Sequence, residues 1–245
     1  MCFHASFFIE IVNLNFVFLH NNYFLQMSFI LSIETATKNC SIGLSKEGKT
    51  IAIKEIANQN FSHAEKLHVF IEEILKENNI SFKDLIAIAV SKGPGSYTGL
   101  RIGVSSAKGL CYALNIPLIS IDTLTSLAKQ IAVEEGIIIP MIDARRMEVY
   151  AALFNPKFEM IKEVDALVID ENSFSDIDEP IHLIGDGAVK FKGILTDDKF
   201  KFYEDVVYPS ANEMSCLAFE KYKKSDFENV TYFEPYYLKD FVLNK

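Results

Sequence analysis

The most constraining feature of this chain is a glycine-rich segment, Ser91–Gly103, with the sequence SKGPGSYTGLRIG. The apolar run Leu85–Val90 leads directly into it and is typical of a short buried strand. Gly93 and Gly95 permit a positive φ or a close backbone approach, and Pro94 stiffens the loop between them. A helical pattern follows. The segment therefore predicts a strand–turn–helix junction, which is typical of α/β proteins.

The start of the predicted helix is suited to binding an anion. Ser96 or Thr98 can cap a helix that begins near Leu100, and the backbone N–H groups of such a terminus point at whatever lies above it. The segment is neither of the common phosphate loops. Gly99 is followed by Leu100 and Arg101 instead of the Lys-Ser/Thr of a P-loop, and Thr98 stands where the dinucleotide fingerprint needs a third glycine.

Small residues recur every four positions along this helix. Gly95, Gly99, Gly103 and Ala107 share one face, and Cys111 continues the row. Because a glycine inside a helix costs roughly 1 kcal/mol relative to alanine, the row predicts that another backbone comes very close. Two interpretations remain open, namely packing within the same domain and contact with a partner subunit.

The order of the predicted elements repeats along the chain. In the first half, periodicity and turn residues predict strands over 29–34, 40–44, 50–56, 85–90 and 116–121, and helices over 62–78, 98–114 and 123–134. A capping box, Ser62-x-x-Glu65, opens the first of these helices. In the second half, strands are predicted over 137–142, 149–154, 160–168 and 181–184, with a last helix beginning at 209–212. The pattern predicts two α/β lobes around mixed sheets, over 28–125 and 126–245, with ligands at the carboxyl ends of the strands.

Composition narrows the function classes. Lys plus Arg number 24 and Asp plus Glu number 33, which gives a formal net charge of -9, so tight direct binding of nucleic acid by this chain alone is not expected. The four cysteines show neither a C-x-x-C pair nor zinc-site spacing, and they fit buried thiols in a reducing compartment.

The first 26 residues differ from the rest. They are rich in apolar side chains, contain no Lys or Arg, and show no small-residue cleavage site, so they do not resemble a secretory signal. Glu10, Asn13, Asn15 and His20 interrupt the apolar run, so no membrane span is expected. We expect translation to start at Met27, residues 1–26 to be dispensable and the protein to be cytoplasmic. A membrane-surface or partner-binding extension is the alternative.

Several polar residues lie at predicted strand ends. Glu34 and Thr35 end the first strand, where a carboxylate and a hydroxyl can orient Mg²⁺ or contact a phosphate, or simply close a turn. Asp143 ends the first strand of the second half and mirrors Glu34, and Asp186 lies between two glycines. The candidate nucleotide-binding residues are Glu34, Thr35, Gly93, Gly95, Ser96, Asp143, Gly185 and Asp186.

Two histidines resemble a metal pair without fitting one. His63 and His68 are five residues apart, which places their rings roughly 140° apart around a helix, whereas a zinc pair on one helix needs a spacing of four. We interpret both as surface or capping histidines and expect no metal site.

These motifs together resemble the TsaB (YeaZ) family. The resemblance rests on segments 30–36, 93–103, 107–110 and 143–145, and extends through 185–187, 209–211 and 236–239. It covers roughly Phe29 to Lys239 and is weakest over 155–180. Glu34 stands where many relatives have Asp, and residues 1–26 have no counterpart.

The resemblance implies an actin-like (sugar-kinase/Hsp70) fold of two lobes and a non-catalytic role. The chain would support a TsaD-like transferase that forms N6-threonylcarbamoyladenosine at adenosine 37 of tRNA, with a TsaE-like ATPase in the same assembly. Alone it would form a homodimer. It would bind no cofactor tightly, and any ATP or ADP with Mg²⁺ would act in the complex. The resemblance places the partner contact on helices 62–78 and 98–114. The predicted interface residues are His63, Leu67, Phe70, Gly99, Leu100, Gly103, Val104, Ala107 and Leu110.

Two other functions remain open. One is an ATP-dependent phosphotransferase of the same fold, with Glu34 or Asp143 as its base. The other is a metallopeptidase, against which the spacing of His63 and His68 argues, because TsaD-like proteins carry H-x-x-x-H.

Overall fold

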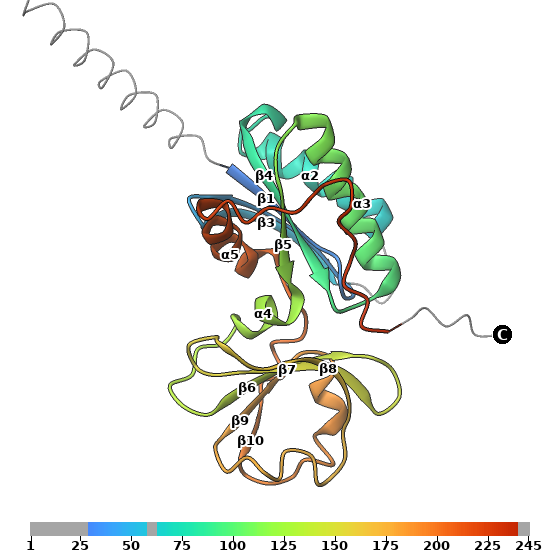
Figure 1. Ribbon diagram of the computed structural model, residues 1–245, viewed down its shortest axis with the longest axis vertical. Coiled ribbons are helices and arrows are strands. Elements are labelled where there is room, and N and C mark those ends of the chain that lie inside the picture. The colour runs from blue at the N-terminus through green and yellow to red at the C-terminus, as the bar shows by residue number, and fades with distance from the viewer. Residues whose placement is uncertain (1–28, 58–62, 240–245) are drawn as a thin grey trace, which may run out of the picture.

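The computed structural model describes residues 29–57 and 63–239, which form two five-stranded sheets, one above the other in Figure 1. Residues 1–26, Met27 and Ser62 of the predicted capping box lie outside the described residues. The strands of the first sheet follow the order β3-β2-β1-β4-β5. Their bounds are β1 Phe29–Glu34, β2 Asn39–Lys46, β3 Lys49–Ala57, β4 Leu85–Gly93 and β5 Leu118–Asp122.

The pairing of the first sheet follows from its sequence. β1 is apolar almost throughout and entirely buried, as a central strand must be. It pairs antiparallel with β2 and parallel with β4, and β4 pairs parallel with β5. β3 alternates between exposed and half-buried residues, which is the pattern of an edge strand. The carboxyl ends of β1, β4 and β5 therefore lie at one edge of the sheet.

Helices cover both faces of this sheet (Figure 1). On one face, α2 (His63–Glu77) and the N-capped α3 (Tyr97–Leu114) pack on the apolar side chains of β1 and β2. A short 3-10 helix, η1 (Phe82–Asp84), lies between α2 and β4. On the opposite face, α5 (Ala211–Lys223) comes so close to β2 that a Cβ at Gly43 would lie 2.9 Å from the carbonyl oxygen of Ala211.

The second sheet repeats the order of the first. Its strands follow β10-β9-β6-β7-β8, with β6 antiparallel to β7 and parallel to β9, as β1 is to β2 and β4. The bounds are β6 Ile137–Asp143, β7 Glu148–Phe154, β8 Met160–Val168, β9 Ile181–Ile184 and β10 Phe200–Phe202. The 3-10 helix η2 (Ala188–Phe191) covers one face, and α4 (Thr123–Ala128) packs on the other.

Two elements differ from the prediction. The helix predicted over 123–134 ends at Ala128, because the following residues cross to the second sheet and the amide of Gln130 donates to the carbonyl of Tyr208 at 2.8 Å. The lobe predicted over 126–245 is also wrong in its last part, since α5 packs on β1, β2 and β3 of the first sheet. The apolar residues of α5 pack on the face of the first sheet that α2 and α3 leave uncovered.

After α5 the chain stays with the first sheet. Residues 226–239, here called the C-terminal strap, run past β5 and along α3 toward the second sheet, as the dark red trace in Figure 1 shows. Over residues 29–57 and 63–239, no helix combines the length and the apolar character needed to cross a bilayer.

Candidate functional site

Glu34 lies at the carboxyl end of β1 and is completely buried. Its Oε1 accepts a hydrogen bond of 2.6 Å from the backbone N–H of Ala36. Its Oε2 is also buried and has no hydrogen-bond partner among the described residues. On the adjacent strand β4, the hydroxyl of Ser91 lies 2.6 Å from that of Thr123. The end of β1, where the sequence predicted a polar site, is thus a buried polar region of the interior.

Burial controls the protonation of this carboxyl. Desolvation raises the pKa of Glu34 from its usual 4.5 to about 7, although the Ala36 N–H and the neighbouring Ser91 hydroxyl act in the opposite direction. The pKa of the Cys40 thiol is raised to about 11, first by burial and then by the nearby Glu34. Near neutral pH, a large fraction of Glu34 is therefore uncharged in the folded protein.

The row of small residues on α3 packs against the end of β1. A Cβ at Gly99 would lie 2.1 Å from the backbone oxygen of Thr35, and one at Gly103 would lie 2.2 Å from Thr35 Oγ1. Thr35 Oγ1 in turn donates to the carbonyl of Gly99 at 2.8 Å. A Cβ at Gly95 would lie 2.3 Å from the oxygen of Ala36. The close backbone approach that the row predicts is thus made within the chain, by the segment that directly follows β1.

The loop before α3 uses its polar groups within the chain. The N–H of Ser96 donates to the carbonyl of Ala36 at 2.7 Å, and the Ser96 hydroxyl caps the helix by accepting from the N–H of Gly99 at 3.3 Å. Gly93 has a φ of 116°, and a Cβ there would lie 2.5 Å from the carbonyl oxygen of Tyr236. The hydrogen-bonding groups at the helix terminus predicted to bind an anion are therefore partly used by Ala36 and Ser96, and the strap covers Gly93.

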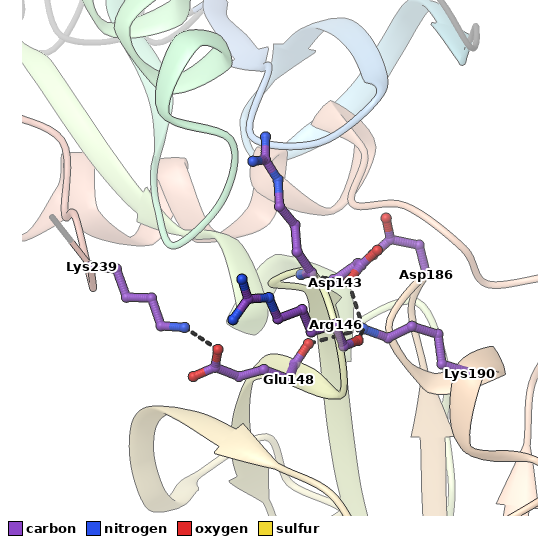
Figure 2. Close-up of polar contacts among 7 residues, drawn as sticks. Asp143, Arg146, Glu148, Asp186, Lys190 and Lys239 are labelled. Carbon is purple, nitrogen blue, oxygen red and sulfur yellow. Dashed lines mark hydrogen bonds and ion pairs between the residues drawn. The ribbon is translucent and has the colours of Figure 1, made fainter. Parts of the chain in front are cut away.

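The second group of candidate nucleotide-binding residues lies at the carboxyl ends of β6 and β9 (Figure 2). The backbone N–H of Asp143 donates to Asp186 Oδ1 at 2.9 Å. Asp143 Oδ1 accepts from Lys190 Nζ at 2.6 Å. Burial raises the pKa of Asp186, and the nearby Asp143 charge adds to the effect, whereas Lys38 and Lys190 lower it. The two carboxylates predicted for this lobe are therefore adjacent.

Lys190 organises the tight turn that follows Asp143. Arg145 and Arg146 both have positive φ values, 71° and 53°, which are unusual for residues other than glycine. Lys190 Nζ donates to the carbonyls of Arg146 and Glu148, at 2.9 and 3.0 Å, as well as to Asp143. Figure 2 shows the ammonium group of Lys190 beside this turn. One lysine thus neutralises Asp143 and stabilises a strained backbone.

Gly185 is required by close packing. Its φ is 99°, and a Cβ there would lie 2.2 Å from the carbonyl oxygen of Met141 on β6. The adjacent Gly187 donates its N–H to the same oxygen at 3.0 Å. These contacts hold Asp186 against the end of β6.

The polar residues near Glu34 and those near Asp143 include hydrogen-bond donors and acceptors of the kinds that bind nucleotides. Many of them already form hydrogen bonds within the chain. Lys38, which follows the end of β1, is among the charges that lower the pKa of Asp186. Oxygens of Asp143 and Asp186 are the type that Mg²⁺ prefers. A pocket of about 290 Å³ lies elsewhere, beside Glu55 and Asp205, and none of the predicted nucleotide-binding residues, all within the described ranges, lines it.

Most of the predicted partner-interface residues are not on the surface. They are buried by contacts within the chain, namely His63, Leu67, Gly99, Leu100, Gly103, Val104 and Ala107. Phe70 and Leu110 are half-buried and pack against the first core. The prediction that these side chains meet a partner is therefore wrong for the buried ones, because they pack within the chain and the small-residue row faces the end of β1. The exposed residues of the same helices include Val69 (44%) and Tyr112 (86%).

The two histidines of α2 contact different elements. His63 is buried, not at the surface as expected, and its Nε2 lies 2.8 Å from the carbonyl of Thr37. Because a carbonyl only accepts hydrogen bonds, Nε2 carries the proton. Burial lowers the pKa of His63, against the effect of this hydrogen bond. His68 is exposed, and its Nε2 lies 3.4 Å from the hydroxyl of Ser106 on α3. The two rings do not converge on a common ligand.

Sequence reasoning missed two residues of this region. Lys190 lies on a four-residue 3-10 helix that shows no periodic signal. Lys239 forms an ion pair with Glu148 from the C-terminal strap (Figure 2). Segment 236–239 takes part in the family resemblance, but nothing in its sequence indicates which strand it contacts.

Comparisons with known proteins show which family this chain resembles. The family model for TsaD, tRNA N6-adenosine threonylcarbamoyltransferase, matches residues 54–208. The tRNA threonylcarbamoyladenosine biosynthesis protein TsaB of Bacillus subtilis is 32% identical over 176 residues, which cover 69% of this chain and 75% of that protein.

A second relative and a solved structure extend the match. The protein of the same name from Escherichia coli is 28% identical over 222 residues, covering 87% of this chain and 95% of the relative. The structure of YeaZ from Pseudomonas aeruginosa superposes with a TM-score of 0.74 at 24% identity, covering 86% of this chain and all of the other. From the identity, the coverage and the shared fold, the chain belongs to the TsaB (YeaZ) family.

Proposed function

We propose that this protein is a non-catalytic subunit in the formation of N6-threonylcarbamoyladenosine on tRNA, where it binds and supports a TsaD-like transferase. The observation that carries the proposal is the kinship, over most of the chain, with proteins named for the biosynthesis of this modified nucleoside. The match to the TsaD family model supports a common origin of this chain and the transferase that it would bind.

The two sheets would form the lobes of an actin-like fold. The repeated order, with antiparallel pairing on one side of the central strand and parallel pairing on the other, supports this proposal. The first lobe would consist of residues 29–122 and 211–239, because α5 and the strap pack on the first sheet.

Two features of this chain support a non-catalytic role. The rings of His63 and His68 contact Thr37 and Ser106, so they do not offer a metal-binding pair. Glu34, which would be the base of a phosphotransferase, is completely buried and hydrogen-bonded to the backbone at Ala36. A general base must lie within hydrogen-bond reach of its substrate.

Reconstitution tests the function directly. The transferase and the ATPase of the same organism would be assayed on unmodified tRNA with ATP, threonine and bicarbonate plus the enzyme that makes the adenylate, with and without this chain. We expect modified nucleoside only when the chain is present. Equal yields without it would contradict the proposal, and ATP turnover by the isolated chain with a sugar acceptor would favour the phosphotransferase.

The partner would contact the outward face of α2 and α3. Val69 and Tyr112 are exposed on these helices, and the contact between His68 and Ser106 joins them into one surface. Exposed apolar side chains mark an interaction site where they form one contiguous patch, and this proposal requires Val69 and Tyr112 to belong to such a patch. The same surface would pair two copies when the chain is alone, and a TsaE-like ATPase would join the transferase complex. Any ATP or ADP with Mg²⁺ would act at the level of this complex.

A matched pair of variants tests this surface. Val69→Glu places a charge on α2, and Val189→Glu places the same charge on the second lobe at a similar exposure, 48% against 44%. Burying an unpaired carboxylate is costly, so we expect Val69→Glu to weaken transferase binding at least about tenfold, and Val189→Glu to leave it unchanged. Titration calorimetry measures both, and equal affinities would rule out this face.

A further inference from the structure

The C-terminal strap is anchored along the whole first lobe. At its start, the N–H of Glu228 donates to the carbonyl of Leu118 on β5 at 2.8 Å, and the hydroxyl of Ser120 donates to Glu228 Oε1 at 2.5 Å. Val230 and Phe233 pack against the core between the sheet and α3. These contacts fix the strap to the first sheet independently of the second.

The middle of the strap is held by α3 and β4. Lys108 of α3 donates to the carbonyls of Thr231 and Phe233, at 3.2 and 2.8 Å. The N–H of Tyr236 donates to the carbonyl of Lys92 at 2.7 Å, directly beside the loop that begins at Gly93. The strap therefore reaches the edge of the first sheet where the strands end.

The last described residues of the strap extend to the second lobe. The ring of Tyr237 lies 4.8 Å from that of Tyr97 at the start of α3. Two residues later, Lys239 forms an ion pair with Glu148 and lies 6.0 Å from the ring centre of Tyr150, both on β7 (Figure 2). A single segment thus contacts both lobes.

This contact lies away from the covalent connections between the lobes. The chain crosses from one sheet to the other at α4 and the residues after it, and again between β10 and α5. Figure 1 shows these crossings on one side of the junction and the end of the strap on the other. A contact on the far side of the junction must break when the lobes separate about these crossings, so its free energy adds to the cost of opening.

We propose that the strap is a clasp that limits the separation of the two lobes and thereby controls access to the strand ends that carry Glu34 and Gly93 on one side and Asp143 on the other. With the ion pair formed, the lobes stay close. When it breaks, the second lobe swings about α4 and the second crossing, and the strand ends separate. This proposal does not depend on the proposed function, since it concerns only contacts within the chain.

Distance measurements between spin labels test the clasp. Labels at Lys49→Cys on β3 and Lys201→Cys on β10 report the separation of the lobes, with Cys2 and the exposed Cys216 replaced by Ser. Both labelled positions are exposed and lie outside the strap. We expect Lys239→Ala to broaden the distance distribution and to raise the open population roughly twofold to fivefold, which corresponds to the strength of an exposed ion pair. Salt at about 1 M should act in the same way, because it screens the pair.

Two further variants keep the test specific. Lys192→Ala removes an ion pair with Glu204 that lies entirely within the second lobe, and it should leave the distribution unchanged. The exchanged pair, Lys239→Glu with Glu148→Lys, should restore a narrow distribution. If Lys239→Ala behaves like Lys192→Ala, or if the exchanged pair stays as broad as Lys239→Ala alone, the clasp is refuted.

Discussion

Helix α3 carries three glycines whose surroundings differ so much that replacing each with alanine should change stability in a different direction. At Gly99, the new Cβ would lie 2.1 Å from the backbone oxygen of Thr35. Relief of this clash requires movement of β1 or α3. Overpacking of this kind costs about 1–3 kcal/mol, and a backbone clash belongs at the upper end. After the gain of about 1 kcal/mol in helix propensity, we expect Gly99→Ala to lower the free energy of unfolding by about 2 kcal/mol.

The other two glycines complete the series. At Gly103, the Cβ would meet the side-chain oxygen of Thr35 at 2.2 Å, which can rotate away if it gives up its hydrogen bond to Gly99. That bond is worth about 1 kcal/mol, so loss and propensity gain should nearly cancel. Gly109 has no atom within 4 Å of its Cβ position, so Gly109→Ala should stabilise the chain by up to about 1 kcal/mol.

Urea denaturation of the isolated chain measures all three values. Each titration should be run at two protein concentrations, because self-association would add to the apparent stability. The expected order of stability is Gly109→Ala, then the natural chain and Gly103→Ala, then Gly99→Ala. If Gly99→Ala unfolds like the natural chain and instead loses its affinity for the transferase, the row faces a partner and the argument from β1 is wrong.

Three further predictions concern protonation and charge. The pKa of Glu34 rises from 4.5 to about 7 on folding, so the ionised form is disfavoured in the folded state. At about 1.4 kcal/mol per pH unit, the free energy of unfolding should fall by about 3 kcal/mol as the pH rises through this window. Glu34→Gln should remove this slope in denaturation measured from pH 4 to 8, and an unchanged slope would contradict it. The pKa of His63 is lowered, so its stabilising contribution is complete above the unfolded value of 6.5 and is lost as the pH falls below it. His63→Gln should flatten that acid limb, and a limb of the same steepness would exclude His63 as its cause. With a net charge of -9, the isolated chain should form no tight complex with tRNA in a gel shift at physiological salt, and submicromolar binding would overturn this.

Local patterns predicted most helices and strands because their causes are local. The cap at Ser96 and the periodicity that follows it place α3 within one residue of the prediction, and the apolar run at Phe29 gives β1 its bounds. The length of α4 could not be predicted, because its end at Ala128 depends on a crossing to another sheet. The start signal at 209–212 likewise identified α5 as a helix but could not indicate which sheet its apolar face covers.

In the candidate site, too, features with local causes were predictable and those set by distant contacts were not. Glu34 and Asp143 are recognisable in the sequence because each follows an apolar strand, and the structure places each at the end of a central strand. The row of small residues on α3 correctly predicted that another backbone comes close, but small residues do not indicate which backbone approaches them. Lys190 and Lys239 were not predictable as site residues, since their contacts join segments far apart in the sequence.

The return of α5 to the first sheet has a consequence for synthesis of the chain on the ribosome. Strands β1 to β5 emerge first, but the helix that covers one of their faces follows the entire second sheet. Until it arrives, the apolar residues of that face have no covering layer, among them Ile30, Ala89 and Ile119. The nascent first lobe therefore passes through a stage with a bare, apolar sheet, in which it is exposed to aggregation and suited to capture by chaperones.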